Sequence, residues 1–206
     1  MKLLLSSAGW EYNLKIGKEF LKLTDKEPSE IKVFLVTTAT KKDREWGYVE
    51  FTVKELEKIG INKNNVSIFS LNKNVKDFDF KGIDVIYVCG GNTFHYLNGI
   101  RKTGLDEKII KAVKEGEAYF GVSAGSIIAG PDISIAGVGS EDPDENDIKL
   151  KNLKGLGLTN LVICSHFNTK VKKIVREFEK KSKNKIVRLT DKQAFLIKNG
   201  KKRLIE

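Results

Sequence analysis

Three short segments of the sequence carry side chains that could together hydrolyse an amide bond. The first, residues 121–125, reads Gly-Val-Ser-Ala-Gly and matches the G-x-S-x-G pattern around a nucleophilic serine. A strand-like run precedes it and a helix-like run follows, so a tight turn would project the Ser123 hydroxyl at the carboxyl end of a sheet. The pattern predicts Ser123 as nucleophile and the N–H of Ala124 as an oxyanion donor. A serine that only caps the helix is the plainer alternative.

A second glycine-rich turn, Gly90-Gly91-Asn92-Thr93, also follows an apolar run and opens a helix-like segment. Such turns bind phosphate groups, but this one has neither the G-x-G-x-x-G pattern nor a P-loop lysine. A serine hydrolase needs a second backbone donor beside its nucleophile, and the N–H of Gly91 suits that role. Asn92 is a candidate substrate contact, although capping of the following helix is the simpler role for its side chain.

The sequence offers two histidines as a general base for Ser123. His166 lies two residues beyond the apolar run 161–164, at the carboxyl edge where Ser123 should emerge. His95 lies in the first turn of a predicted helix near the same edge. We predict His166 as the base, and His95 as a substrate-facing or merely exposed residue.

The carboxylate that would orient His166 has two candidate locations. Asp191 follows the predicted strand 186–189 and so lies at the same edge of the sheet. The acidic segment 141–147 is a loop that could fold over the site, although a run of acids is ordinarily a solvated loop. From position alone, the third member of the triad is either Asp191 or one of the loop acids Glu141, Asp142 and Asp144.

Helix and strand patterns alternate along the whole chain. The run Lys32–Thr37 is apolar without alternation, which is typical of a parallel strand buried on both faces. The predicted strands are 2–6, 32–37, 66–70, 84–89, 119–122, 161–164, 186–189, 194–197 and 203–205, and the predicted helices are 11–23, 43–58, 93–101, 105–114, 170–181 and one beginning at 124. They predict one α/β domain over residues 1–206, with a doubly wound, mostly parallel sheet, helices on both faces and a small antiparallel C-terminal edge in a flavodoxin-like three-layer arrangement.

Composition narrows the possible partners and compartment. The formal net charge is +10, yet the lysines are spread over almost every predicted helix, which favours a generally basic surface over a nucleic-acid site. No apolar run is long enough to cross a bilayer and the N-terminus does not resemble a signal peptide, so we expect a cytoplasmic protein with no membrane contact. Cys89 and Cys164 should be reduced and buried, and the scattered cysteines and histidines predict no metal site.

Three blocks of the sequence together resemble the peptidase E family of α-aspartyl dipeptidases, whose wider family includes cyanophycinase. They are VIYVCGGNTFHYL at 85–97, AYFGVSAGSIIAGP at 118–131 and ICSHFNT at 163–169. The opening KLLLSS and the spacing of the blocks also match, so the resemblance covers most of the chain. It implies a fold like the class I glutamine amidotransferase domain, with serine in place of cysteine at the elbow.

The resemblance also implies roles for individual residues. Ser123 corresponds to the nucleophile, His166 to the base, and the amides of Gly91 and Ala124 to the oxyanion hole. The acidic third member falls on Asp191, where members of the family commonly carry glutamate. Aspartate is one methylene shorter, so this position departs from the family pattern.

These observations predict a serine peptidase that hydrolyses short peptides, Asp-Xaa dipeptides among them, through an acyl-enzyme and without a cofactor. The chain would act as a monomer or homodimer. The alternatives are another serine amidohydrolase or esterase on the same fold, or a non-catalytic binding module with an incomplete triad. Aspartyl specificity would require a cation near the site, and the nearest basic residues after the histidine are Lys170, Lys172, Lys173 and Arg176.

Overall fold

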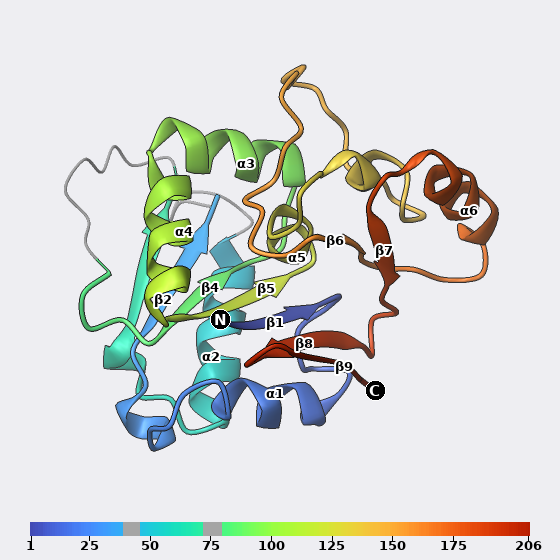
Figure 1. Cartoon of the computed structure of the whole chain (residues 1–206). Helices are drawn as coiled ribbons and strands as arrows, with labels where there is room; N and C mark the ends of the chain where they lie inside the picture. Colours follow the sequence, from blue (N-terminus) through green and yellow to red (C-terminus); the bar gives the residue numbers. More distant parts are fainter. Residues whose placement is uncertain (39–45, 72–79) are drawn as a thin grey trace.

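The computed structural model describes residues 1–38, 46–71 and 80–206, and its centre is a twisted sheet (Figure 1). Within the described residues the sheet has seven strands in the order β3-β2-β4-β5-β1-β8-β9. The pairs β2–β3, β2–β4, β4–β5 and β1–β5 are parallel, whereas β8 runs antiparallel to β1 and to β9. The predicted α/β class, with a mostly parallel sheet and an antiparallel C-terminal edge, is confirmed.

The elements alternate along the chain much as their apolar patterns predict. The strands are β1 (Lys2–Ser6), β2 (Val33–Thr37), β3 (Val66–Ser70), β4 (Val85–Val88), β5 (Ala118–Val122), β6 (Leu161–Cys164), β7 (Lys185–Arg188), β8 (Ala194–Lys198) and β9 (Lys201–Ile205). The α-helices are α1 (Leu14–Leu21), α2 (Trp46–Lys58), α3 (Thr93–Lys102), α4 (Leu105–Glu115), α5 (Ala124–Ile128) and α6 (Lys172–Lys181). Short 3₁₀ turns lie at Pro28–Glu30, Lys63–Asn65 and Ser134–Gly137.

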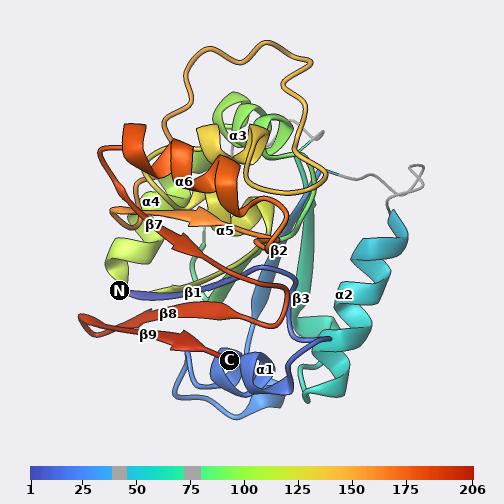
Figure 2. The ribbon, with the colours of Figure 1, turned by 90° about the vertical axis from the view of Figure 1, so that its right-hand side faces the viewer.

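Helices cover both faces of the central sheet, which explains why its inner strands lack alternation. All residues of β2 and β4 are buried. Figures 1 and 2 show α1 and α2 on one face and α3, α4 and α5 on the other. On the α1 side, Trp10, Phe20, Tyr87 and Phe120 form one aromatic cluster, with Phe120 4.8 Å from Tyr87 between ring centroids. This packing fixes the strands whose carboxyl ends carry the candidate site.

The strands β6 and β7 do not extend the central sheet, although the alternating pattern predicted a single one. They pair with each other in a separate parallel two-stranded sheet, and Figure 1 shows them beside α6 at one end of the molecule. The physical reason lies at β1, whose second edge is already paired with β8 along its whole length. Even so, the carboxyl ends of β5 and β6 lie close together, because the side chain of Ser123, directly after β5, contacts that of His166, two residues after β6.

Several element boundaries differ from the sequence prediction. Helix α1 begins at Leu14 rather than Glu11, because the side chain of Asn13 accepts a hydrogen bond from the Lys15 amide at 3.0 Å and caps it there. The predicted start of the next helix at Asp43 lies outside the described residues, which resume at Trp46.

The predicted hairpin turn between β8 and β9 is confirmed. Both of its central residues have positive φ, 52° at Asn199 and 77° at Gly200. In the part of the chain that the structure describes, no helix combines the length and apolar character needed to cross a bilayer.

Candidate active site

Ser123 occupies the sharp turn between β5 and α5 that the sequence predicts. Its backbone has φ 48° and ψ −111°, a region that residues other than glycine rarely adopt. The Ser123 amide donates to the carbonyl of Ser6 at 3.0 Å, which ties the turn to the end of β1. The strained backbone therefore projects the hydroxyl at the carboxyl edge of the sheet.

The two glycines of the motif are required by close packing of the backbone. A Cβ atom on Gly121 would lie 2.5 Å from the carbonyl of Gly125, and one on Gly125 would lie 2.2 Å from the carbonyl oxygen of Val88. Real side chains cannot approach so closely. The hydroxyl of the buried Ser126 lies 2.7 Å from the carbonyl oxygens of both Ser6 and Gly121, and so further holds the turn.

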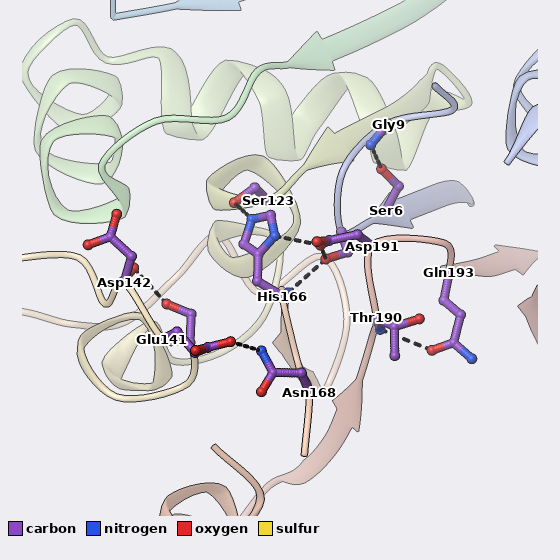
Figure 3. Close-up of polar contacts among 12 residues, drawn as sticks. Ser6, Gly9, Ser123, Glu141, Asp142, His166, Asn168, Thr190, Asp191 and Gln193 are labelled. Carbon is purple, nitrogen blue, oxygen red and sulfur yellow. Dashed lines mark hydrogen bonds and ion pairs between the residues drawn. The ribbon is translucent and has the colours of Figure 1, made fainter. Parts of the chain in front are cut away.

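The structure brings Ser123, His166 and Asp191 into one hydrogen-bonded row (Figure 3). Oγ of Ser123 lies 2.8 Å from Nε2 of His166, and Nδ1 of the same imidazole lies 2.6 Å from Oδ1 of Asp191. Both distances suit hydrogen bonds that would hold the imidazole ready to accept the serine proton. The shorter aspartate side chain thus reaches the imidazole.

Ser7 completes this arrangement and was not predicted from the sequence. Its buried hydroxyl accepts a hydrogen bond from the His166 amide at 2.7 Å and donates one to Oδ1 of Asp191 at 3.0 Å. One side chain therefore fixes both the backbone of the histidine and the carboxylate that faces its ring. Its position in the sequence could have indicated this role. Ser7 directly follows β1, and β1 pairs with β5, which ends just before the predicted nucleophile Ser123.

His166 is held on a short loop between β6 and α6. Its backbone is left-handed, with φ 56°, and the amide of the next residue, Phe167, donates to the Leu189 carbonyl at 2.9 Å. The guanidinium of Arg188 lies over the Phe167 ring, 5.0 Å from its centroid, and also pairs with Glu179 on α6. The end of β7 thus holds the residue after His166 and so fixes the position of the histidine.

The turn at Gly91 lies beside Ser123 in the same cavity lining, and the side chain of Asn92, the next residue, forms hydrogen bonds that cap α3. Gly91 has φ 146°, and a Cβ atom there would lie 2.9 Å from the ring of Tyr96, so glycine is required. Oδ1 of Asn92 accepts from the amides of Phe94 and His95 at 3.0 and 3.1 Å and caps α3. The capping role considered for Asn92 is confirmed.

The acidic loop is clamped onto the first turn of α3. Nδ2 of Asn92 donates to the Glu145 carbonyl at 2.9 Å, and the Thr93 amide donates to Asp144 at 2.8 Å. Nε2 of His95 lies 2.7 Å from Asp147, and this hydrogen bond is the main cause that lowers the pKa of the Asp147 carboxyl. His95 therefore binds the acidic loop through Asp147.

Glu141, one of the loop acids considered for the triad, forms its hydrogen bonds with residues other than His166. Its carboxylate accepts hydrogen bonds from Asn168 at 2.8 Å and from Lys170 at 2.7 Å, and the Lys170 contact lowers its pKa. In the view of Figure 3, Glu141 lies on the opposite side of His166 from Asp191. The carboxylate that contacts the imidazole is Asp191.

Neither cysteine suits the role of nucleophile. Both are free and buried. Burial raises the pKa of the Cys89 thiol to about 12, and burial likewise raises the pKa of Cys164 to about 12. A thiol with such a pKa stays protonated near neutral pH and is a poor nucleophile.

A cavity of about 590 Å³ opens directly beside Ser123 and His166. Its described lining comes from the carboxyl ends of β1, β2, β4 and β5 and the residues after them, from α2, from the acidic loop and from the loop after β6. The lining residues are Ser7, Ala8, Gly9, Trp10, Glu11, Thr37, Thr38, Tyr48, Val49, Phe51, Thr52, Glu55, Tyr87, Cys89, Gly90, Gly91, Val122, Ser123, Asp142 and His166. Its volume is typical of sites that bind small molecules.

Two further observations bear on what the site holds. In residues 1–38, 46–71 and 80–206, no three His, Cys, Asp or Glu side chains cluster in a way that could bind a metal ion. The basic residues considered for substrate binding, Lys170, Lys172, Lys173 and Arg176, line a different, shallow surface depression on α6 together with Thr169, Glu177 and Lys180.

Comparisons with known proteins agree on one family. The sequence model of peptidase family S51 matches residues 3–205. An uncharacterized peptidase of Listeria monocytogenes, Lmo0363, is 30% identical over 171 residues, which are 81% of this chain and 82% of the relative. Peptidase E of Citrobacter koseri is 39% identical over 87 residues, which are 41% of this chain and 34% of that protein.

Solved structures share the fold over almost the whole chain. One, a candidate peptidase E from Listeria monocytogenes EGD-e, has a TM-score of 0.77 at 24% identity and covers 99% of this chain and 97% of its own. Another, a peptidase from an acI-B1 Actinobacterium, has a TM-score of 0.65 at 17% identity and covers 99% of this chain and 86% of its own.

Proposed function

Because the chain belongs to peptidase family S51 and is a serine-type peptidase, we propose that Ser123, His166 and Asp191 are its catalytic triad and that it hydrolyses short peptides. The observation that carries the proposal is the row of two hydrogen bonds, 2.8 Å and 2.6 Å long, that joins the serine hydroxyl to the imidazole and the imidazole to the carboxylate. That row ends in a cavity large enough for a dipeptide.

The proposed reaction proceeds through an acyl-enzyme. Nε2 of His166 accepts the proton of the Ser123 hydroxyl while Oγ attacks the carbonyl carbon of the scissile bond. The carbonyl oxygen becomes an oxyanion, which the amides of Gly91 and Ala124 would stabilise, aided by the N-terminal position of Ala124 in α5. His166 then gives the proton to the leaving amine and the C–N bond breaks.

Water completes the cycle. His166 accepts a proton from a water molecule as its oxygen attacks the ester carbon, and the serine leaves with that proton to release the new carboxylic acid. Asp191 stabilises the imidazolium that exists between the two transfers. Ser7, in turn, holds Asp191 and the His166 backbone in register. His166 is thus the only residue of this scheme that both accepts and donates protons, taking them from Ser123 and water and giving them to the leaving amine and back to Ser123.

Selectivity for an N-terminal aspartate is the finer alternative raised by the sequence. It would require a cation beside Ser123 to pair with the substrate carboxylate. The basic residues considered for that role lie on α6 and around it, and they line a separate depression rather than the cavity. We therefore propose hydrolysis of short peptides without a preference for Asp-Xaa.

Removal of the nucleophile tests the proposal. Ser123→Ala should fold normally and reduce turnover of dipeptides by at least about 10³-fold, because the covalent route is lost. His166→Ala should have a comparable effect, and the loop residue variant His95→Ala a much smaller one. Turnover would be followed on a dipeptide library, with circular dichroism to check folding.

A fluorophosphonate probe provides an independent measurement. Wild-type protein should gain one probe mass on the peptide that contains Ser123, and the Ser123→Ala variant should gain none. A Ser123→Ala variant with near wild-type turnover would contradict the assignment. Rapid hydrolysis of esters with no hydrolysis of any dipeptide would instead favour the esterase alternative.

A further inference from the structure

We propose that the cavity beside Ser123 selects peptides that carry a lysine or arginine side chain, with Glu55 and Glu11 as the residues that attract the cation. The proposal rests on the proposed function, since it assumes that Ser123 attacks the bound peptide. It specifies which short peptides the enzyme would hydrolyse, a preference that the three proposed catalytic residues do not determine.

The charge of the cavity lining is opposite to that of the chain. The whole sequence has 37 Lys and Arg residues against 27 Asp and Glu residues. The described residues that line the cavity include the carboxylates of Glu11, Glu55 and Asp142 and not one lysine or arginine. A cavity with low-dielectric walls and charges of one sign concentrates ligands of the opposite sign. The described part of the lining should therefore attract cations, although the net charge of the chain is positive.

Glu55 has the most favourable position for this role. It lies on α2, one turn after Thr52, which also lines the cavity, and its side chain is only 14% exposed. Oε1 is 2.5 Å from Nζ of Lys58, whose side chain is 69% exposed and does not line the cavity. Oε2 accepts no hydrogen bond from the residues that the structure describes. A substrate cation would find this second oxygen available in a partly desolvated setting, where a charge-assisted hydrogen bond is strongest.

The electrostatic field of both glutamates reaches the interior of the cavity. Burial raises the pKa of the Tyr87 phenol well above its usual range, and Cys89 and then, to a smaller degree, Glu11 and Glu55 raise it further. Both carboxylates therefore act on the same buried ring from within the lining. Glu11 is exposed and also interacts with its neighbour Tyr12, so its attraction for a substrate should be weaker.

The uncharged lining suits the rest of a long basic side chain. Trp10 and Tyr87 are almost fully buried, whereas Tyr48 and Phe51 are exposed at the start of α2. Aromatic surfaces pack against the methylene stem of lysine or arginine, and their faces attract the charged end. An aspartate side chain would gain neither interaction and would be repelled by the lining carboxylates.

Dipeptide pairs that differ in one charge test the proposal on the wild-type enzyme. Lysine is compared with norleucine, which keeps the hydrocarbon stem and lacks the ammonium group, in Lys-Leu against Nle-Leu and in Leu-Lys against Leu-Nle. We expect kcat/KM for lysine to exceed that for norleucine by at least about tenfold in one of the two positions. Added salt should reduce this ratio, because screening weakens the attraction.

Variants then locate the selectivity. Glu55→Gln should lower the lysine-to-norleucine ratio to about one to two, and Glu11→Gln should lower it by a smaller factor. Glu57→Gln is the matched control, because Glu57 is an exposed residue of the same helix outside the cavity lining. It should leave both the ratio and the turnover unchanged.

Equal rates for lysine and norleucine in both positions would overturn the proposal, as would faster hydrolysis of Asp-Leu than of Lys-Leu. Either result would leave the serine mechanism intact, provided that the uncharged dipeptides are hydrolysed. Failure of the proposed function has a different signature, since no dipeptide would be turned over and Ser123 would not react with fluorophosphonate. Because the comparison uses wild-type protein, it does not depend on whether a variant folds.

Discussion

The two halves of the proposed triad are held by different forces. Ser123 lies on a turn where a single added carbon on Gly125 would approach the Val88 carbonyl oxygen to 2.2 Å, so its position is fixed by packing. His166 and Asp191 have side chains that are 41% and 51% exposed and are fixed by hydrogen bonds, two of them through Ser7. The nucleophile is thus part of the core of the fold, whereas the base and its carboxylate are attached to the core by polar contacts.

This contrast separates the expected effects of mutations. Changes around Ser123 should damage folding and activity together, since the backbone has no room to move. Changes around the imidazole should leave folding almost intact and act on catalysis, since the exposed groups contribute little packing.

The largest effect is expected for Gly125→Ala. Its Cβ would lie 2.2 Å from the Val88 carbonyl oxygen and 3.0 Å from Cβ of Val88, so β4 and α5 must separate. We expect a loss of at least about 3 kcal/mol in the free energy of unfolding, measured by urea denaturation, together with loss of activity. Gly47→Ala is the control, because a Cβ there meets no atom within 4 Å, and it should be at least as stable as wild type. Equal stability of the two variants would show that the elbow is not fixed by packing.

A smaller effect, on catalysis alone, is expected for Asp191→Asn. The amide keeps the shape of the side chain but removes the charge that stabilises the imidazolium, so kcat should fall by about 10²-fold or more with a modest change in KM. Glu141→Gln serves as a comparison on the other side of His166, where the carboxylate pairs with Asn168 and Lys170, and should have little effect on kcat. A crippled Glu141→Gln enzyme beside an active Asp191→Asn enzyme would transfer the carboxylate's role to the loop.

The smallest effect is expected for Ser7→Ala. The variant loses the bond to Asp191 and leaves the His166 amide without its acceptor, yet Ser123 and the imidazole remain in place. We expect kcat to fall by about tenfold while KM changes by less than about twofold, because positioning rather than binding is impaired. Ser7→Thr, which retains a hydroxyl, should recover part of kcat. A rise in KM at constant kcat would assign Ser7 to substrate binding instead.

The sequence predicted those parts of the molecule that depend on local patterns. The strands Lys2–Ser6 and Val66–Ser70 and the start of α5 at Ala124 agree with their apolar runs, and the G-x-S-x-G motif led to the residues that meet at the carboxyl edge. The separate β6–β7 sheet was missed because an apolar run does not encode its pairing partner. Ser7 was missed for a related reason, since a serine after a strand has no pattern of its own and acquires its role only from residues more than 150 positions away.

The clamp between the acidic loop and α3 bears on the entropy of substrate binding. Asn92, Thr93 and His95 hold the loop at Glu145, Asp144 and Asp147 within one helical turn. Fixing a loop costs roughly 1–2 kcal/mol per residue in backbone conformational entropy. Since these contacts form as the chain folds, that cost is met before any ligand arrives, and the cavity wall at Asp142 is preorganised. The free energy released on contact with a peptide is then available to hold the scissile bond against Ser123 rather than to order the loop.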